Sequence, residues 1–335
     1  MFWESNPTNI KSPVFRGNIA ISLITQKTLR APILPRIDFQ VLYGIELIVS
    51  HIGLDLWMSK MDPIIEEAIR DSLEKPEGKL TKGDYNKVHE LRISGEELKD
   101  VSSLAGLSGL KQLDLSYNEL GIHRKVLGES GDQLKHLAKL RKLEVLDLSE
   151  NHLIDVSALA SLKNLTYLGL SYNKITDIST LGSFSKLVTL ALDSNGLTSL
   201  DGLSKLDKLE TLTLDYNEIK DMSVLAGLKH LKDLRLRHNG FTDLSFLEGL
   251  TNLEELALGG NQLTDLSVLA GLKKLKYIDI QDNQIIDLNA LAGLKKLRFL
   301  QFGDNRLIQG NIHKELPRSQ ITKLKKALPK CVMKP

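Results

Sequence analysis

Leucine recurs along this chain at a fixed interval of 22 residues. Each copy follows the pattern L-x-x-L-x-L-x-x-N, and an earlier, weaker copy at Val88 has Glu96 in place of the asparagine. Self-similarity at a period of this size is typical of a solenoid, in which each coil packs only on its neighbours. We therefore predict about ten stacked coils. One copy begins at Leu110, and after a longer interval of 33 residues the copies at intervals of 22 begin at Leu143, Leu165, Leu187, Leu209, Leu231, Leu253, Leu275 and Leu297.

The order of apolar and polar positions within a coil predicts the path of the chain. Leu146 and Leu148 alternate with outward residues, which is the two-residue period of a strand. Stacked coils then form one parallel sheet, and the asparagine turns the chain out of each strand because its amide both donates and accepts. An aspartate follows the next apolar position, where it can cap a short helical turn on the convex side. It is found at Asp100, Asp155, Asp177, Asp221, Asp243, Asp265 and Asp287.

The pattern divides the chain into four segments. Residues 1–60 lie outside the repeat, and their basic composition is that of an unstructured tail or of a targeting segment. Residues 61–87 predict an N-terminal capping helix, which Asp62 and Pro63 begin and Pro76 ends. The repeats span residues 88–308 and contain an insertion near residues 121–131. Residues 309–335 predict a C-terminal cap with a short helix that Pro329 stops.

Composition excludes several classes of function. The formal net charge of +2 is the difference of two large, interspersed totals, so it favours neither nucleic acid nor a membrane surface as a partner. The single cysteine, Cys331, allows no intrachain disulfide, and no apolar run reaches the roughly 18 residues of a membrane span. We expect a cytoplasmic monomer without a membrane span that binds a protein and no nucleic acid.

The motifs of catalysis and of metal binding are missing from the sequence. It contains no glycine-rich phosphate loop, no H-E-x-x-H and no paired-cysteine spacing. The histidines, such as His152 and His238, fall at different positions of the repeat and form no constellation. We therefore predict a noncatalytic protein that needs no cofactor and no metal.

The outward side chains of the predicted strands form the candidate binding surface. Tyrosine and arginine are enriched in interface hot spots, and phenylalanine is common in interface cores. The same residues could instead be ordinary solvated side chains, with Asp215 and Arg237 as mere neighbours on adjacent strands. We favour an interface. The candidate partner-binding residues are Tyr167, Tyr172, Asp193, Asp215, Tyr216, Arg235, Arg237, His238, Tyr277 and Phe299.

Stretches such as NLTYLGLSYNKITDISTLGSFSKL and NLEELALGGNQLTDLSVLAGLKKL resemble the leucine-rich repeats of the internalin class. The resemblance covers about residues 88–308. It implies an α/β fold, a right-handed leucine-rich-repeat solenoid (horseshoe) with a parallel concave sheet, short 3-10 turns on the convex side and helical caps. It also implies that a protein partner binds the concave face.

Two other functions remain open from the sequence. The regulatory subunit of the type-one protein phosphatase also has 22-residue coils, although its coils generally lack the D-x-S pair found here. A surface-displayed adhesion module is the other alternative. The sequence shows no LPxTG-like sorting motif, which is why we expect a cytoplasmic location.

Overall fold

The residues that the structure describes belong to one compact unit. The structure is a computed structural model, and it describes residues 61–121, 133–309 and 312–335. The predicted extension at residues 1–60 and the predicted insertion near residues 121–131, apart from Gly121, lie outside the described residues. The segment boundaries at residues 61–87, 88–308 and 309–335 stay predictions.

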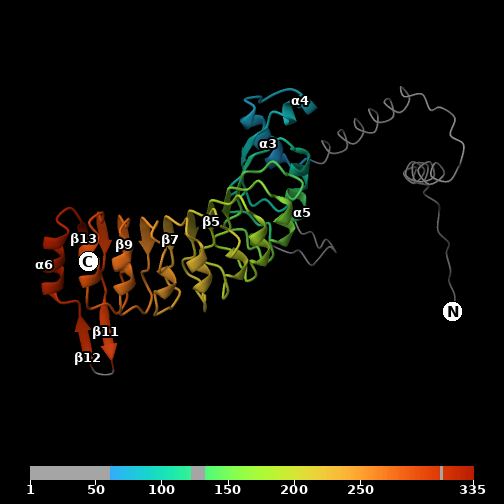
Figure 1. Cartoon of the computed structure of the whole chain (residues 1–335). Coiled ribbons are helices and arrows are strands. Elements are labelled where there is room, and N and C mark those ends of the chain that lie inside the picture. The colour runs from blue at the N-terminus through green and yellow to red at the C-terminus, as the bar shows by residue number, and fades with distance from the viewer. Residues whose placement is uncertain (1–60, 122–132, 310–311) are drawn as a thin grey trace, which may run out of the picture. The chain divides into compact units, whose positions relative to one another are not determined.

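Eleven of the described strands form one parallel sheet (Figure 1). Ten coils each contribute one strand of three residues, and an eleventh strand, which follows the coils in the sequence, pairs with the strand of coil 10. The predicted solenoid with a parallel sheet is thus confirmed. Its strands are β1 (Glu90–Arg92), β2 (Gln112–Asp114), β3 (Val145–Asp147), β4 (Tyr167–Gly169), β5 (Thr189–Ala191), β6 (Thr211–Thr213), β7 (Asp233–Arg235), β8 (Glu255–Ala257), β9 (Tyr277–Asp279), β10 (Phe299–Gln301) and β13 (Val332–Lys334). Coils are numbered below by the strand that they contain.

The register of the sheet places equivalent residues side by side. Leu212 of β6 pairs with Leu190 on one side and Leu234 on the other. These leucines are fully buried, whereas Thr211 and Thr213 on either side of Leu212 are partly exposed. A shift of one residue would turn every leucine to solvent, so burial of one face fixes this register.

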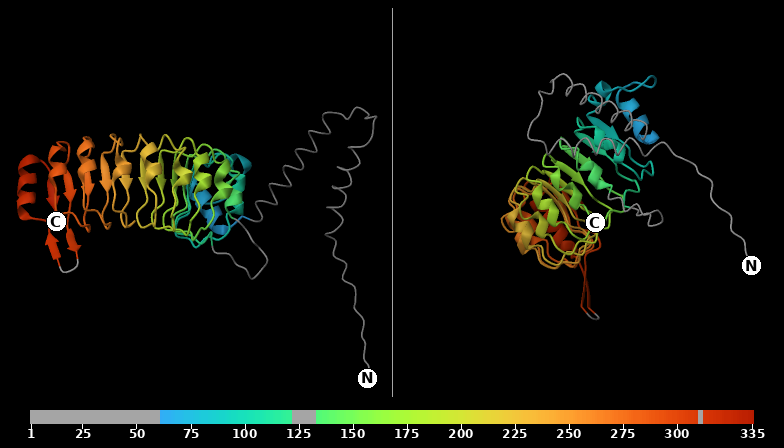
Figure 2. Two further views of the ribbon diagram at one scale, coloured as in Figure 1. Left: turned by 60° about the horizontal axis from the view of Figure 1, so that its bottom comes forward. Right: turned by 90° about the vertical axis from the view of Figure 1, so that its right-hand side faces the viewer.

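Short 3-10 helices lie on the side of the coils away from the sheet (Figure 2). The predicted capping occurs: in coil 6 the backbone N–H of Ser223 donates to Asp221 Oδ1 at 2.8 Å. The helices are η1 (Ser102–Gly106), η3 (Ser157–Ser161), η4 (Ser179–Ser183), η5 (Asp201–Leu203), η6 (Ser223–Gly227), η7 (Ser245–Leu247), η8 (Ser267–Gly271) and η9 (Asn289–Gly293), and the α-helix α5 (Leu134–Leu137) precedes β3.

One continuous apolar core lies between the sheet and these helices. In coil 6, Leu209, Leu212, Leu214 and Leu225 have no exposed surface. Burying a leucine side chain contributes roughly 1.5–3 kcal/mol before the loss of conformational entropy. Because each coil closes its core only against its neighbours, the stack holds the sheet side chains at fixed spacings.

The asparagines form a ladder that satisfies buried backbone groups. Asn217 Nδ2 donates to the carbonyl oxygens of Leu192 at 3.0 Å and Leu214 at 3.1 Å. Its Oδ1 accepts from the backbone N–H of Leu197, in the preceding coil, at 3.2 Å. The amide therefore joins two coils, as the sequence predicted, and leaves few unpaired groups at the turn.

Coil 7 departs from this ladder. Asn239 Nδ2 still donates to the carbonyl oxygens of Leu214 at 2.9 Å and Arg237 at 3.0 Å, but its buried Oδ1 has no hydrogen-bond partner. An open cavity of about 560 Å³ lies beside it, with Met222, Phe241 and other residues in its lining. The Asn239 amide thus makes one hydrogen bond to coil 6, where the Asn217 amide makes two to coil 5.

Two helices precede the first strand. In α3 (Pro63–Ser72) the Asp62 side chain accepts from the backbone N–H of Ile64, and Ile65 and Ile69 are buried in the common core. The helix ends at Ser72, before the predicted break at Pro76. Ser72 Oγ donates to the carbonyl oxygen of Glu90 in β1 at 3.0 Å. The second helix is α4 (Lys82–Tyr85).

The C-terminal segment contains more than the predicted helix. An antiparallel hairpin of β11 (Arg306–Gln309) and β12 (Ile312–Glu315) follows coil 10 (Figure 1). The predicted helix is α6 (Arg318–Ala327), and its Leu324 side chain is buried. The strand β13 then continues the sheet, with Val332 paired to Phe299. The sequence did not predict the hairpin or β13, because neither carries the leucines of the repeat.

The aspartates that precede the 3-10 helices make stability sensitive to acid. Hydrogen bonds from the serine two residues later lower the pKa of four of these carboxyl groups below 3.8. The backbone N–H of that serine is the larger cause for Asp177 and Asp221, and its hydroxyl is the larger cause for Asp243 and Asp265. A carboxylate with a lowered folded-state pKa stabilises fully above its unfolded pKa, and the contribution is lost as pH falls through the folded value.

We therefore expect the urea midpoint of the protein to decrease below about pH 4. The decrease should be smaller in the D177N/D221N/D243N/D265N variant, because asparagine accepts the same N–H bond without titrating. Urea unfolding at about pH 5 and about pH 2.5 measures both proteins. Equal acid-induced decreases would contradict this account.

Candidate functional site

Four side chains of each coil lie on the outer side of the sheet and form four rows. In coil 6 they are Thr211 (row 1), Thr213 (row 2), Asp215 (row 3) and Tyr216 (row 4). The ten candidate residues all lie in these rows. Row 1 contains Tyr167, Tyr277 and Phe299, row 2 contains Arg235, row 3 contains Asp193, Asp215 and Arg237, and row 4 contains Tyr172, Tyr216 and His238.

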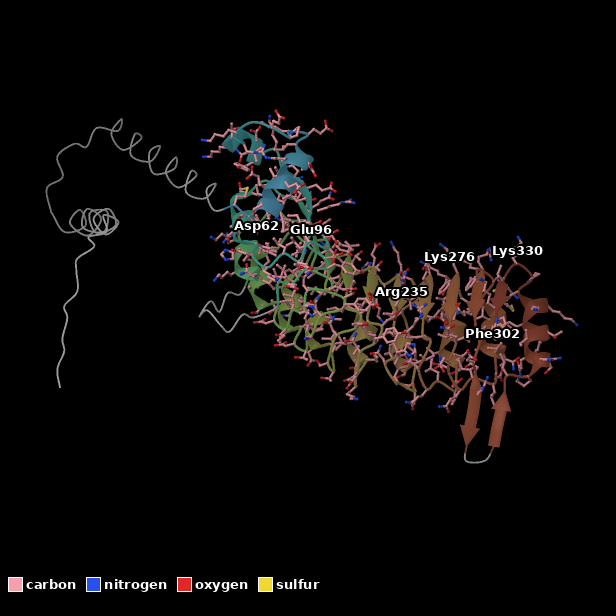
Figure 3. The ribbon with its side chains drawn as sticks, turned by 180° about the vertical axis from the view of Figure 1, so that it is seen from behind. Asp62, Glu96, Arg235, Lys276, Phe302 and Lys330 are labelled. Carbon is pink, nitrogen blue, oxygen red and sulfur yellow. The ribbon has the colours of Figure 1, made fainter. Side chains whose placement is uncertain are left out.

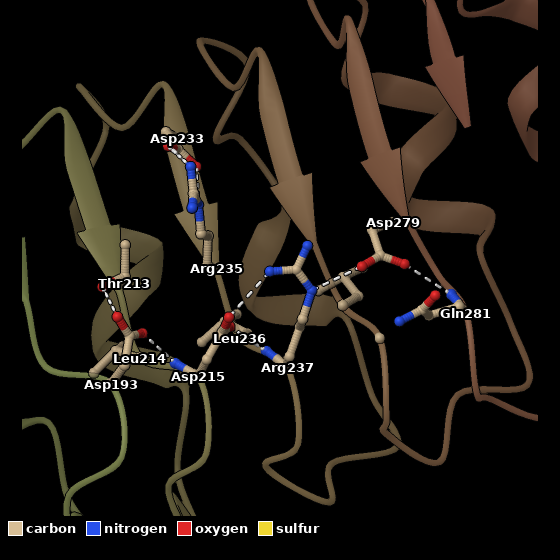
Figure 4. Close-up of polar contacts among 12 residues, drawn as sticks. Asp193, Thr213, Leu214, Asp215, Asp233, Arg235, Leu236, Arg237, Asp279 and Gln281 are labelled. Carbon is tan, nitrogen blue, oxygen red and sulfur yellow. Dashed lines mark hydrogen bonds and ion pairs between the residues drawn. The ribbon is translucent and has the colours of Figure 1, made fainter. Parts of the chain in front are cut away.

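Three of the candidates belong to a polar chain that crosses coils 5 to 9 (Figure 4). Asp193 Oδ1 accepts from the backbone N–H of Asp215 at 2.8 Å. Arg237 Nη1 then donates to Asp215 Oδ2 at 3.1 Å, and Arg237 Nε donates to Asp279 Oδ2 at 2.7 Å. The chain continues as Asp279 Oδ1 accepts from the backbone N–H of Gln281 at 3.0 Å.

Arg237 reaches Asp279 across a whole coil. The intervening coil 8 has Ala257 in row 2 and Gly259 in row 3, so no long side chain stands between them. A Cβ at Gly259 would lie 3.3 Å from Asp279 Oδ2 and 3.1 Å from Gln281 Cγ, which leaves little room for any side chain there. The small residues of coil 8 thus permit this ion pair.

Burial makes the ion pair costly to break. The Asp279 side chain is 1% exposed and that of Arg237 is 24% exposed. Burial disfavours the charged form of Arg237, but the hydrogen bonds to Asp279 and Asp215 outweigh it and raise the pKa of the guanidinium. Burial also raises the pKa of Asp215. The charges of Arg237, Asp215 and Asp279 already pair with one another. They therefore connect strands of the sheet and are less available to form ion pairs with a partner.

Arg235 lies two residues before Arg237 but is much more exposed. Its Nη2 donates to Asp233 Oδ2 at 3.1 Å, and 46% of its side chain is accessible. An exposed pair of this kind contributes about 0–1 kcal/mol to stability. Arg235 is therefore available to a partner in a way that Arg237 is not.

Two pairs of rings stack across neighbouring coils. Tyr216 and His238 in row 4 have ring centroids 4.4 Å apart at an interplanar angle of 15°. Gly260 follows them at φ +68°, and a Cβ there would overlap the His238 ring, so the position of that ring requires glycine and the left-handed backbone favours it. Tyr277 and Phe299 in row 1 stack at 5.2 Å and 4°, and both are partly buried.

Tyr167 and Tyr172 differ in their surroundings although they belong to one coil. Tyr167 in row 1 is partly buried, and its hydroxyl donates to Asp147 Oδ2 at 3.2 Å. Burial and the neighbouring Asp147 carboxylate raise the pKa of Tyr167 to about 12. Tyr172 in row 4 is an exposed large side chain. Only Tyr172 of these two presents most of its ring to solvent.

Row 4 has a left-handed backbone in every coil. This conformation costs an ordinary L-residue about 1–2 kcal/mol and costs glycine almost nothing. Coils 1 and 8 use glycine there, whereas coils 2, 4 and 6 carry tyrosines that are 59%, 55% and 53% exposed. Folding alone does not call for a large exposed ring at a strained position. The row consists of Gly95, Tyr117, Glu150, Tyr172, Ser194, Tyr216, His238, Gly260, Asp282 and Asp304.

Sequence reasoning missed several partners of the candidates, notably Asp279, Asp147 and Asp233. Asp279 could have been found from Ala257 and Gly259, because small residues between an arginine and an acid two coils away permit a bridge. Lys334 Nζ, 5.3 Å from the centre of the Phe299 ring, was also missed, because its strand lies outside the repeat.

The remaining surface shows no concentration of metal-binding groups. Within the described ranges, no group of three or more histidine, cysteine, aspartate or glutamate side chains could hold a metal ion.

In the same part of the chain, no helix has the length and apolar character needed to cross a bilayer. Side chains of both charges are distributed along the stack, from Asp62 to Lys330 (Figure 3).

Known proteins share both the repeats and the fold. Family models described as "Leucine Rich repeats (2 copies)" match residues 141–183 and 229–271, and models described as "Leucine rich repeat" match residues 185–241 and 251–307. An internalin (InlF) of Listeria monocytogenes is similar over 82% of this chain and 81% of its own, with 28% identity and a TM-score of 0.66. Internalin C2 of the same species is similar over 71% of this chain and 92% of its own, with 27% identity and a TM-score of 0.54. This chain is a leucine-rich-repeat protein of the internalin-like class. No curated protein sequence gave a significant match to this internalin-like chain.

A similarity with a lower TM-score is found to the protein of an RNA complex. The receptor in the TLR13–ssRNA13 complex is similar over 66% of this chain but only 34% of its own, with 25% identity and a TM-score of 0.52. That receptor is bound to RNA in its structure, so the repeat architecture alone does not decide the class of ligand. The side chains of this internalin-like sheet must do so.

Proposed function

We propose that this chain is a noncatalytic scaffold that binds a protein partner on the outer side of its sheet. The rigid stack presents rows 1 to 4 with little conformational entropy left to lose on binding. Exposed tyrosines are typical of interface hot spots. The observation that carries the proposal is row 4, where tyrosines occupy strained backbone positions that glycine or aspartate occupies in other coils.

The charge of the sheet supports a protein over a nucleic acid as the partner. In coils 2 to 6, rows 1 to 4 contain five acidic residues and no lysine or arginine. A phosphate backbone would be repelled here, because binding to nucleic acid depends on lysine and arginine contacts to phosphates. The acids are Asp114, Asp147, Glu150, Asp193 and Asp215.

Affinity capture from a native lysate with the full chain as bait tests this function. We expect the Tyr172→Ala/Tyr216→Ala variant to capture at least about tenfold less of the partner, which corresponds to about 1.4 kcal/mol of binding energy. The Arg235→Ala/Tyr277→Ala variant tests the second half of the sheet in the same way. Arg237 stays unchanged, because removing it would leave Asp279 buried without its ion-pair partner.

The matched control is Ile154→Ala, which removes a side chain that is 56% exposed outside the four rows. The Ile154→Ala variant should capture as much partner as the original chain. All of the variants should unfold at the same temperature as the original chain. Capture that neither sheet variant reduces would refute binding on this face. A phosphatase catalytic chain among the captured proteins would identify the scaffold as a phosphatase-regulatory subunit.

A further inference from the structure

The exposed tyrosines of row 4 recur with a definite spacing. Tyr117, Tyr172 and Tyr216 belong to coils 2, 4 and 6, so two strands separate each ring from the next. Neighbouring strands lie about 4.8 Å apart, which places the backbones that carry these rings about 9.6 Å apart along a line that crosses the strands. The residues between them, Glu150 and Ser194, carry no ring.

A polyproline II helix has nearly the same period. It completes a turn in three residues with a rise of about 3.1 Å each, so every third side chain returns to one side after about 9.3 Å. Its carbonyl groups make no internal hydrogen bonds and are free to accept from tyrosine hydroxyls. Proline-rich segments in this conformation are recognised on aromatic surfaces, since they are already ordered before binding.

The charged residues of the sheet indicate which charge the ligand carries. The same coils 2 to 6 contain only acidic charges in rows 1 to 4, and Glu150 lies in row 4 between Tyr117 and Tyr172. Its carboxylate is near enough to raise the pKa of the Tyr117 hydroxyl. Only Asp215 of these five acids pairs with an arginine, Arg237, that is supplied by coil 7. Arginine or lysine residues in the ligand would therefore complement this part of the sheet.

We propose that row 4 of coils 2 to 6 binds a basic, proline-rich segment of a partner protein in the polyproline II conformation. The segment lies across the strands, and successive turns pack on Tyr117, Tyr172 and Tyr216. Its basic residues face Glu150 and the acids of rows 2 and 3. This inference rests on the proposed function, because it names the kind of protein segment that the sheet recognises.

Fluorescence anisotropy with two labelled peptides tests the inference on the full chain. One probe consists of four Pro-Pro-Arg triplets, and the other consists of four Gly-Ser-Arg triplets with the same charge and length. We expect the proline-rich probe to bind at least tenfold more tightly. Tyr172→Ala/Tyr216→Ala should reduce its affinity to that of the Gly-Ser-Arg probe, whereas Tyr172→Phe/Tyr216→Phe should keep most of the difference and Ile154→Ala all of it.

Three results would overturn the inference. Equal binding of the two peptides would show attraction by charge alone, and a preference that survives Tyr172→Ala/Tyr216→Ala would place the site elsewhere. Displacement of the peptide by a single-stranded oligonucleotide would contradict the charge argument. Failure here can be told apart from failure of the proposed function, because lysate capture that depends on the tyrosines would persist even if the proline-rich probe did not bind.

Discussion

Asn217→Ala is expected to lower the free energy of unfolding by about 3–5 kcal/mol, since several buried groups lose their partners at about 1–3 kcal/mol each. The carbonyl oxygens of Leu192 and Leu214 and the backbone N–H of Leu197 all bond to this amide. Alanine has no polar atom to replace it, and the packed turn admits little water. Urea denaturation of the full chain measures the loss.

Asn239→Ala provides the matched control for this substitution. Asn239 occupies the same position one coil later, but its Oδ1 has no partner and its residue is partly exposed. Its removal should therefore cost clearly less than the removal of Asn217. A cost for Asn217→Ala no greater than that for Asn239→Ala would show that the ladder does not hold the coils together.

Arg237→Met is expected to destabilise the protein by about 3–5 kcal/mol, the usual cost of leaving one charge of a buried pair without its partner. The substitution leaves two carboxylates without their arginine, that of Asp279, whose side chain is 1% exposed, and that of Asp215, whose side chain is 13% exposed. Methionine fills a similar volume, so the loss reports charge and hydrogen bonding more than packing. The measurement is the urea midpoint at neutral pH, compared with that of the original chain.

Two further variants separate the causes. Arg235→Met changes the exposed neighbour, whose pair is worth about 0–1 kcal/mol, and should have little effect. Arg237→Met/Asp279→Asn should recover part of the loss, because asparagine removes the more deeply buried charge and still accepts from the backbone N–H of Gln281, whereas Asp215 stays without its arginine. The account fails if Arg237→Met is as mild as Arg235→Met, or if the double variant recovers nothing.

The periodic part of the fold could be predicted from the sequence because each coil repeats the same local physics. The residues equivalent to Leu146 and Leu148 point inward in every copy, the asparagine turns the chain, and the following aspartate caps a helix. These interactions involve one coil or two neighbouring coils, so a single template describes them. The hairpin of β11 and β12 and the strand β13 carry no template residues, and nothing in the repeat predicts them.

The candidate site was predictable only as a set of rows. The alternation showed that Asp215, Arg237 and Tyr216 share one face, but it gave no information on how far a side chain extends. The bridge from Arg237 to Asp279 depends on small residues in the coil between them. Similarly, the pattern places Tyr167 in row 1 and Tyr172 in row 4 of one face, but it does not show that the ring of Tyr167 is partly buried beside Asp147 while that of Tyr172 is exposed.

The unpartnered Oδ1 of Asn239 changes how coils 6 and 7 are joined. The Asn239 amide makes one hydrogen bond to coil 6, where the Asn217 amide makes two to coil 5, and an open cavity of about 560 Å³ lies beside Asn239. On the sheet side, Asp215 and Arg237 fasten the seam between coils 6 and 7. The ion pair between Asp215 and Arg237 therefore supplies a larger share of the polar bonding at this seam than side-chain ion pairs do between coils 5 and 6, where the asparagine bonds are complete.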